Sequence, residues 1–310
     1  MPLMSLILML WLNWRLLSVQ EPKKNLISKV SQSAYTWATA LFGLALLPGL
    51  LLILAAVITY RHMTWSMMQR PDTSLSGLTV LFVVFILLSL GYFLRLGYAT
   101  YAIIKNSRQT IERIVPQLAP FPLSDLPAFF ANQKIAVRIG LWDSPDAFTY
   151  GVVHPTIVIS RRLHQILDAP ALTAILAHEA HHVRSHDYAL QQIFLVILRA
   201  FPWLPLESLY RFYLTAREIR ADQFAIVWQH TADHLMQAMV TTIHALREQP
   251  HSQFSGETAW NSVWQARINA LINSETVPLS PEARTLFSAA LIPFATSAVL
   301  AITSLSLFCH

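Results

Sequence analysis

Long charge-free apolar blocks alternate with polar segments along this chain, and they predict membrane-spanning helices. Residues 37–60 and 286–308 carry no charged side chain, and residues 79–104 form a third apolar block whose second half is weaker. About 20 residues cross the hydrocarbon layer of a bilayer, so each block is long enough to span it. Residues 1–14 are apolar but short, and we interpret them as a further spanning helix rather than an interfacial one.

The one long hydrophilic stretch, residues 106–285, predicts a separate domain. Short β-type runs at 135–139, 147–151 and 156–160 predict strands, and helical sequence dominates after them. Asp168 is a candidate cap for a helix that is expected to continue without a break to about residue 192.

These patterns together predict a mainly α membrane protein with about four transmembrane helices and an α+β domain. The predicted division is a membrane region over 1–105 (helices at about 1–14, 37–60 and 79–104), the domain over 106–285, and a fourth transmembrane helix over 286–310.

Composition and charge placement agree with a membrane location. Charged residues make up 13% of the chain, against about 25% in soluble proteins, and hydrophobic residues make up 54%. The net charge of +5 comes from basic residues between the apolar blocks, which favours membrane topology over nucleic-acid binding. The positive-inside rule places 15–36 and 105–285 in the cytoplasm, and the loop 61–78 and both termini outside. The single cysteine, Cys309, can form no internal disulfide.

One short segment carries the candidate chemistry. His178 to His182 reads H-E-x-x-H, and on a helix His178 and His182 project from the same face, where two imidazoles can reach one tetrahedral zinc ion. Glu179 is the next residue after His178 on the helix, beside the position where a metal-bound water would lie. His181 lies off this face, and His186 lies one turn further along it.

A third ligand is expected from a following helix. Glu218 and Asp222 are four residues apart on one helical face, and the small side chains of Ala221 and Ala225 share that face and permit close approach. Asp222 is then a candidate partner that accepts a hydrogen bond from a ligating imidazole and fixes its tautomer. The alternative is an amphipathic helix in which Arg217 and Arg220 form ordinary ion pairs.

The apolar stretch 189–206 tests this arrangement. A single membrane crossing there would put His182 and Glu218 on opposite sides of the bilayer, where they could not share a metal ion. We therefore interpret the stretch as the end of the active-site helix followed by a segment that lies on or dips into the bilayer.

At this point the sequence resembles the BlaR/MecR-type antirepressor metallopeptidases, which are bacterial membrane zinc proteases of the gluzincin class. The matching stretch runs over residues 146–226, from "DAFTYG" through H-E-x-x-H and R-x-x-D to E-x-x-x-D. The resemblance implies one Zn²⁺ per chain bound by His178, His182 and Glu218, with Glu179 as catalytic base and Asp222 behind a ligand. It also implies a bacterial inner-membrane protein with a cytoplasmic protease domain. No penicillin-binding sensor follows the last apolar block, which argues against direct sensing of β-lactams.

A related group, the HtpX/Ste-type membrane quality-control proteases, shares H-E-x-x-H, E-x-x-x-D and an edge strand similar to "DAFTYG". The 35 residues between His182 and Glu218 leave no room for the pair of crossings inserted in that group, so the antirepressor group is favoured.

The expected activity is hydrolysis of peptide bonds in a cytoplasmic or membrane-proximal protein. The expected substrate-binding strand comprises Ala147, Phe148, Thr149, Tyr150 and Gly151, which could hold an extended peptide by strand addition. Arg267 and His234 are candidates for stabilising the oxyanion.

Expected partners are a protein or peptide substrate, with a DNA-binding repressor among the candidates, the lipid bilayer, and a second copy of the chain in a homodimer. Direct binding to nucleic acid is not expected. A competing function is a non-catalytic signalling protein that keeps zinc as a structural centre.

Overall fold

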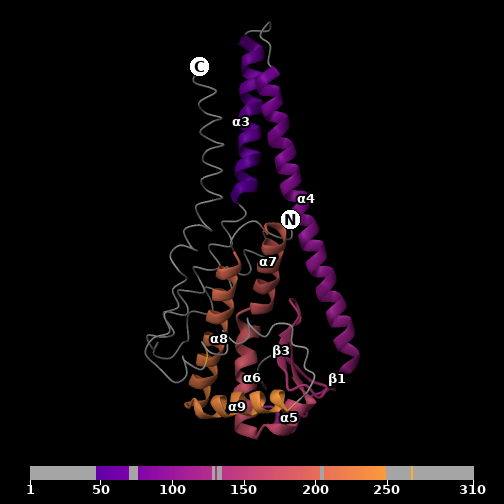
Figure 1. Ribbon diagram of the computed structural model, residues 1–310, viewed down its shortest axis with the longest axis vertical. Coiled ribbons are helices and arrows are strands. Elements are labelled where there is room, and N and C mark those ends of the chain that lie inside the picture. Colours follow the sequence, from indigo (N-terminus) through magenta and orange to yellow (C-terminus); the bar gives the residue numbers. More distant parts are fainter. Residues whose placement is uncertain are drawn as a thin grey trace.

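The protein is mostly helical with one small mixed sheet (Figure 1). The computed structural model describes residues 47–69, 76–127, 130, 135–202, 206–248 and 267. The predicted spanning segments 1–14 and 286–310 lie outside these residues.

Two long apolar helices form an antiparallel hairpin at one end of the described structure (Figure 1). These are α3 (Leu47–Gln69) and α4 (Ser76–Ile114), and both are long and apolar enough to cross a membrane. Large side chains such as Leu87 and Leu94 are more than half exposed, which is costly in water and favourable in lipid. Both helices extend past the predicted apolar blocks, so most of the expected 61–78 loop is helical.

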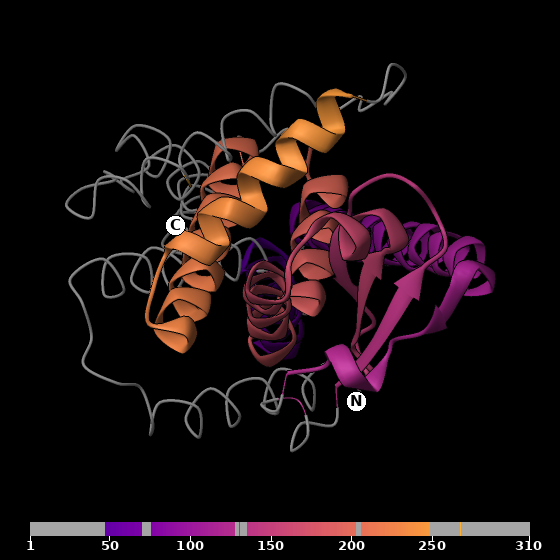
Figure 2. The same ribbon diagram turned by 90° about the horizontal axis from the view of Figure 1, so that it is seen from below.

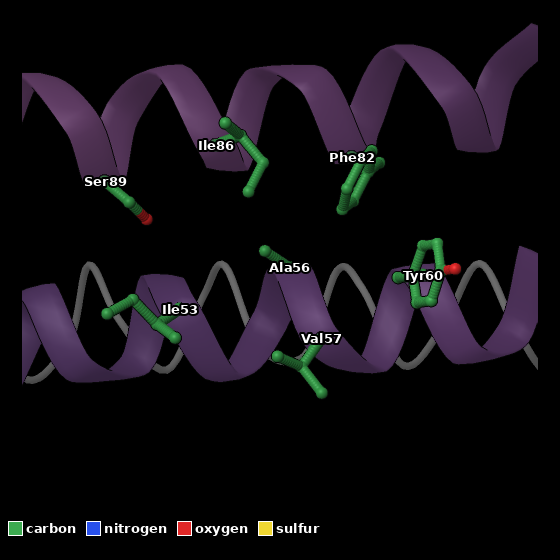
Figure 3. A pocket seen from close by; sticks show the side chains of 7 residues that line it. All are labelled: Ile53, Ala56, Val57, Tyr60, Phe82, Ile86 and Ser89. Carbon is green, nitrogen blue, oxygen red and sulfur yellow. The ribbon is translucent and has the colours of Figure 1, made fainter.

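A narrow apolar cavity of about 190 Å³ lies between α3 and α4 (Figure 3). Its lining consists of Ile53, Ala56, Val57, Tyr60, Phe82, Ile86 and Ser89. The Tyr60 and Phe82 rings approach to 5.8 Å between centroids, and the buried face of each helix carries small residues such as Ala56 and Ser89. Small residues let helix backbones approach closely, which is how apolar helices pack in a bilayer.

The sheet has the strand order β1-β2-β4-β3. Its strands are β1 (Leu118–Pro120), β2 (Ala136–Gly140), β3 (Ala147–Tyr150) and β4 (Thr156–Ser160). β2 and β4 run parallel, whereas β1–β2 and β3–β4 are antiparallel. Three strands lie within a residue of the predicted runs, whereas β1 forms in a proline-rich stretch for which no strand was predicted. Two short 3₁₀ turns, Val115–Gln117 and Leu123–Asp125, flank β1.

The turn after β3 depends on a glycine. Gly151 has φ +94°, and a Cβ atom there would lie 2.6 Å from the carbonyl oxygen of His154. Only glycine adopts this conformation without strain, so Gly151 directs the chain from β3 back into β4.

Helices cover the sheet from one side (Figure 2). They are α5 (Arg161–Ile166), α6 (Ala169–Arg184), α7 (Asp187–Ala200), α8 (Glu207–Gln229) and α9 (Asp233–Arg247). The predicted cap of α6 is confirmed, because the Asp168 carboxylate accepts a hydrogen bond from the Ala171 amide at 2.9 Å. α6 packs on β3 and β4 through one face and on α8 and α9 through the other.

The prediction of one continuous helix to residue 192 is wrong. The chain breaks at Ser185 and His186, and His186 adopts the left-handed conformation (φ 55°) before α7 begins at Asp187. No glycine or proline marks this break in the sequence. The new helix start turns the Asp187 carboxylate back toward α6, where it contacts His182.

α7 and α8 form a second hairpin, which runs toward the apolar α3–α4 hairpin and returns (Figure 1). α7 packs along α4, and a core cluster joins the three helices through Ala99 of α4, Phe194 and Ile197 of α7, and Leu209 and Tyr213 of α8. The reversal after Ala200 brings α8 back beside α6, so His182 and Glu218 lie close together.

Candidate metal and catalytic site

The two histidines of the H-E-x-x-H motif face each other across one turn of α6. The Nε2 atoms of His178 and His182 are 3.1 Å apart, and both side chains are almost fully buried. α6 is buried around these positions because alanines, including Ala177 and Ala180, allow α8 and the sheet to pack closely against it. The spacing of four residues therefore places both nitrogens in one small volume, as the sequence predicted.

Glu218 reaches the same volume from α8. Its Oε2 atom is 3.2 Å from His178 Nε2, and its Oε1 atom is 3.6 Å from His182 Nε2. The small residues of the contact face, Ala221 and Ala225, are fully buried, which is what close approach of α8 to α6 requires. The structure thus brings together the three residues that the sequence singled out as metal ligands.

The three side chains fit a tetrahedral metal ion. Zinc binds imidazole nitrogen and carboxylate oxygen at about 2.0–2.2 Å, so neighbouring ligand atoms in a tetrahedral site lie about 3.3–3.5 Å apart. The two contacts of His178 Nε2, 3.1 Å to His182 Nε2 and 3.2 Å to Glu218 Oε2, are close to that value. The 3.6 Å contact of His182 Nε2 is with the other carboxylate oxygen of Glu218. His178, Glu179 and His182 also form a buried group whose ligand atoms lie within 4.8 Å of one another and could hold a metal ion.

The charge of the site also favours a divalent cation. Four carboxylates (Glu179, Asp187, Glu218, Asp222) surround the imidazoles, against two guanidiniums (Arg217, Arg267). The side chains of Glu218 and Arg217 are 14% and 17% exposed, and the other four residues are buried. With neutral imidazoles this leaves an excess of about two negative charges, which a divalent cation neutralises.

The ionisation of the ligands reflects these charges. Burial lowers the pKa of His182, but Glu218 and Asp187 outweigh it and raise that pKa to about 10. Burial raises the pKa of the Glu218 carboxyl, but Arg217 and His182 hold it well below its usual range. Glu218 is therefore an ionised carboxylate, and the negative surroundings that favour an imidazolium favour a metal cation equally.

Asp222 stands behind His178, as the sequence predicted. Its Oδ1 atom is 2.9 Å from His178 Nδ1, which is an ion-pair distance. Arg267 donates two hydrogen bonds to the Asp222 carboxylate, from Nε at 2.9 Å and from Nη2 at 2.7 Å. Arg267 also reaches the third candidate ligand directly, because its Nη1 atom is 3.6 Å from Glu218 Oε2. His234, the other candidate for stabilising the oxyanion, lies in the first turn of α9, and its described contacts do not connect it to the histidines.

Asp187 holds His182, a role that was not predicted from the sequence. Its Oδ2 atom is 2.8 Å from His182 Nδ1, and the side chain is 1% exposed. The aspartate of R-x-x-D in the family resemblance is this residue, so a signal was present. The contact depends on the break at His186, because Asp187 is five residues after His182 and would lie off its face in a continuous helix.

Arg217 positions the third ligand from within the protein. It donates to Glu218 Oε1 from Nε at 3.1 Å and from Nη2 at 2.7 Å. Its Nη1 atom donates to Gln191 of α7 at 3.0 Å, and the Gln191 amide donates to the Tyr210 hydroxyl at 3.2 Å. One carboxylate oxygen of Glu218 is therefore tied to Arg217 while the other faces His178. From the sequence, Arg217 was expected only in an ordinary ion pair of the alternative amphipathic helix.

The candidate base, Glu179, lies between the histidines and the sheet. Its Oε2 atom accepts a hydrogen bond from Thr149 Oγ1 of β3 at 2.9 Å. β3 is an edge strand, bonded to β4 on one side and to no second strand among the described residues. The expected substrate strand, Ala147 to Tyr150, thus borders the site directly. Phe148 and Tyr150 face away from Glu179 and form an aromatic row with Trp142.

The two other histidines of the segment have different surroundings. His181 contacts Ser185 Oγ at 3.1 Å and the ring of Phe224, and burial together with Arg220 lowers its pKa to about 3. His181 is therefore a neutral residue that packs against α8 outside the metal position. His186 lines a shallow cleft beside His182.

Comparison with known proteins identifies the class of this site. Residues 105–205 match the family model of peptidase family M48. No curated protein matches the chain. The matched region contains α6 and the sheet but ends before Glu218, and it does not confirm the BlaR/MecR-type assignment, which stays a prediction. Since members of this peptidase family use a metal ion, the match and the buried His178–Glu179–His182 group together show that the chain carries a metallopeptidase domain.

Proposed function

We propose that the protein is an integral membrane zinc endopeptidase that cleaves a cytoplasmic or membrane-proximal protein. The observation that carries the proposal is the position of Glu179. It lies in the same turn of α6 as the two histidines and is hydrogen-bonded to the edge strand that borders the site. A purely structural zinc centre would have no need of an additional carboxylate at that place.

Glu179 supplies the general base. The residues that would hold zinc are His178, His182 and Glu218, and zinc bound there would polarise the attacking water and the scissile carbonyl. Glu179 takes a proton from that water as its oxygen attacks the carbonyl carbon. When the C–N bond breaks, the protonated Glu179 returns this proton to the leaving amine, so the base is regenerated.

Thr149 orients the base. Its hydroxyl donates to Glu179 Oε2, which leaves the other carboxylate oxygen available for the water proton. Arg217, Asp222 and Asp187 orient the metal ligands in the same way, by charge and hydrogen bonding to Glu218, His178 and His182 respectively. Two of these partners, Arg217 and Asp222, come from α8 and the third, Asp187, comes from α7. Partners of this kind are typical of metal sites.

The edge strand defines the kind of substrate. An extended peptide adds to β3 through main-chain hydrogen bonds, which do not depend on side-chain identity. A folded protein has few free extended segments. The substrate is therefore an unfolded or extended segment of a protein.

For the physiological role we propose signalling through cleavage of a repressor or of the chain itself, on the basis of the BlaR/MecR-type resemblance. Membrane quality control is a second candidate, favoured by the edge strand, because backbone recognition accepts unfolded segments of varied sequence. Co-expression with a candidate repressor tests the first role. Accumulation of uncleaved misfolded membrane proteins in a deletion strain tests the second.

The test of catalysis is Glu179→Gln in the full-length protein. This change keeps size and hydrogen bonding but removes the base, so zinc content should stay at about one per chain while cleavage falls by about 10²–10⁴-fold. A matched control is Glu207→Gln, which removes an exposed carboxylate whose contact is with Arg211. If Glu179→Gln retains full cleavage or signalling output with zinc bound, the site is structural and the protein is not a protease by this mechanism.

A fusion experiment tests the membrane orientation. A topology reporter placed after Ser252 should report the cytoplasm, and one placed after His310 should report the outside. Reports from the same side would contradict either the fourth span or the orientation.

A further inference from the structure

We propose that the α4–α7 pair acts as a rigid spacer that holds the catalytic site a fixed distance from the bilayer. The substrate is then cleaved within about 4–8 residues of the point where its own chain leaves the membrane. This inference rests on the proposed endopeptidase function and specifies its substrate class as membrane-anchored chains with an extended juxtamembrane segment.

The spacer is visible in two contacts between α4 and α7. Arg95 Nε of α4 donates to the carbonyl oxygen of Ala200, and the hydroxyls of Ser107 and Tyr188 are hydrogen-bonded to each other. Arg95 and Ser107 are twelve residues apart on α4, and their partners Ala200 and Tyr188 are twelve residues apart on α7 in the opposite order. The two helices therefore run antiparallel (Figure 1). At 1.5 Å per residue, both helices advance about 18 Å between these contacts.

The pair is packed along this length and has no flexible joint. Tyr92 of α4 stacks on Phe201 at 4.7 Å between ring centroids. Ala99 is 1% exposed and lies in the same core cluster as Phe194 and Ile197 of α7. α4 itself is a single helix from Ser76 to Ile114, so the membrane-spanning part and the part that contacts the catalytic domain are one rigid element.

The charges on α4 locate the bilayer surface. From Ser76 to Leu94 the helix carries no charged residue, Arg95 is the first, and the exposed Lys105 is the second. Twenty helical residues cross about 30 Å of hydrocarbon, and the first twenty of α4 end at Arg95. The hydrocarbon boundary therefore falls between the levels of Arg95 and Lys105. Arg199, exposed in the last turn of α7, lies near the level of Arg95.

The depth of the site follows from the same helices. Tyr188 is level with Ser107, and His182 lies six residues before Tyr188, which adds at most about 9 Å. His182 is then about 12 Å from the boundary if this lies at Lys105, and about 27 Å if it lies at Arg95. An extended chain advances about 3.3 Å per residue, so it covers this distance in about 4–8 residues.

The route of such a chain to the site runs past the start of α7. A shallow cleft beside His182 is lined by Thr149, Gly151 and Val152 at the end of β3 and by Tyr188 and Ala189 at the start of α7. Val152 is 43% exposed and Val153 is 79% exposed. A peptide that leaves the bilayer beside α7 would pass this cleft and reach the free edge of β3 in extended form.

The test uses the full-length protein reconstituted in vesicles with a model substrate. The substrate is a single transmembrane helix followed by a 60-residue unfolded tail of varied sequence, made in several versions with the tail segments in different order. Cleavage positions are mapped by mass spectrometry, with the Glu179→Gln protein as the background. A tail without the transmembrane helix is added to the same vesicles as a soluble competitor.

We expect cuts to cluster about 4–8 residues from the transmembrane helix in every version, whatever sequence occupies that position, and the soluble tail to be cut at least about tenfold more slowly. Cuts distributed along the whole tail, or cuts that follow one sequence when it is moved, would overturn the spacer inference but leave the endopeptidase function intact. No cuts above the Glu179→Gln background in any tail would overturn the endopeptidase function itself.

Discussion

Replacement of Asp187 should weaken zinc binding even though Asp187 does not touch the metal position. Its carboxylate is 2.8 Å from His182 Nδ1 and is 1% exposed, so water cannot substitute for it. It also lies in the first position of α7, where the helix dipole favours its negative charge. Loss of this carboxylate leaves the His182 ring without its charged partner and makes its Nε2 atom a weaker ligand.

The size of the effect depends on what replaces the carboxylate. Partners of ligating histidines contribute about 10–100-fold in metal affinity, equivalent to about 1.4–2.8 kcal/mol. In Asp187→Asn the amide oxygen can still accept the Nδ1 hydrogen bond, and only the charge is lost, so we expect about tenfold. Asp187→Ala removes both and should approach 100-fold.

Zinc affinity is measured by competition with a chromophoric chelator at fixed pH and ionic strength, and circular dichroism checks the fold. Asp233→Asn is the matched control, because Asp233 is likewise the first residue of a helix but is exposed and bonded to Thr231. An affinity of Asp187→Ala within about threefold of the parent protein, with the fold intact, would refute the reasoning, since it would lie below the expected range.

Four further predictions follow from the site and its surroundings. Glu218→Gln should lower both zinc content and cleavage, because it weakens a ligand, and elemental analysis together with the cleavage assay checks both. Arg217→Lys keeps the charge but cannot donate two hydrogen bonds to Glu218, so zinc affinity should fall by about tenfold in the chelator competition, whereas Arg211→Lys should have no effect. In the metal-free protein, the pKa of His182 is about 10 in the folded state, against 6.5 in the unfolded chain. The stabilising effect of this protonated imidazole is complete below pH 6.5 and is lost as the pH rises toward 10. The Tm of the metal-free protein should therefore fall between pH 6.5 and pH 10. Gly151→Ala should destabilise the domain by about 1–3 kcal/mol in denaturant unfolding because of its positive φ and the close His154 carbonyl, whereas Gly97→Ala, with open space at its Cβ position, should not.

Much of the local structure could be predicted from the sequence. Asp168 caps α6 as expected, because a side-chain cap needs only the residue and the helix start beside it. The strands at 136–140, 147–150 and 156–160 follow from their β-type runs. The apolar blocks gave the α3–α4 hairpin in outline, although both helices are longer than the blocks, since a helix does not end where its hydrophobicity does.

Some local features were not predictable because packing decided them. β1 forms in a proline-rich stretch because β2 offers it an edge to pair with. The break between α6 and α7 has no glycine or proline to mark it, and the left-handed conformation of His186 is held by the contacts on both sides. A pattern read along the chain contains no information on such a partner.

In the candidate site, too, some features follow from the local sequence and others from tertiary packing. The sequence alone determined that His178 and His182 share a helix face with Glu179 beside them. The reason is that the α-helical repeat is a local property, which places residues four apart on the same face. It also indicated Glu218 and Asp222 as a pair, from the same repeat on another helix. These residues needed no tertiary information to be chosen.

Only the tertiary structure decided how these pieces meet. The α7–α8 reversal brings Glu218 within 3.2 Å of His178 Nε2, the break at His186 turns Asp187 toward His182, and Arg267 reaches Asp222 from 45 residues further along the chain. The physical reason is that each contact joins separate elements whose approach is set by packing, chiefly by the buried alanines between α6 and α8 and by the core shared with α4. Periodicity fixes the direction of a side chain relative to its own helix, whereas its distance from a side chain on another helix depends on every residue packed between them.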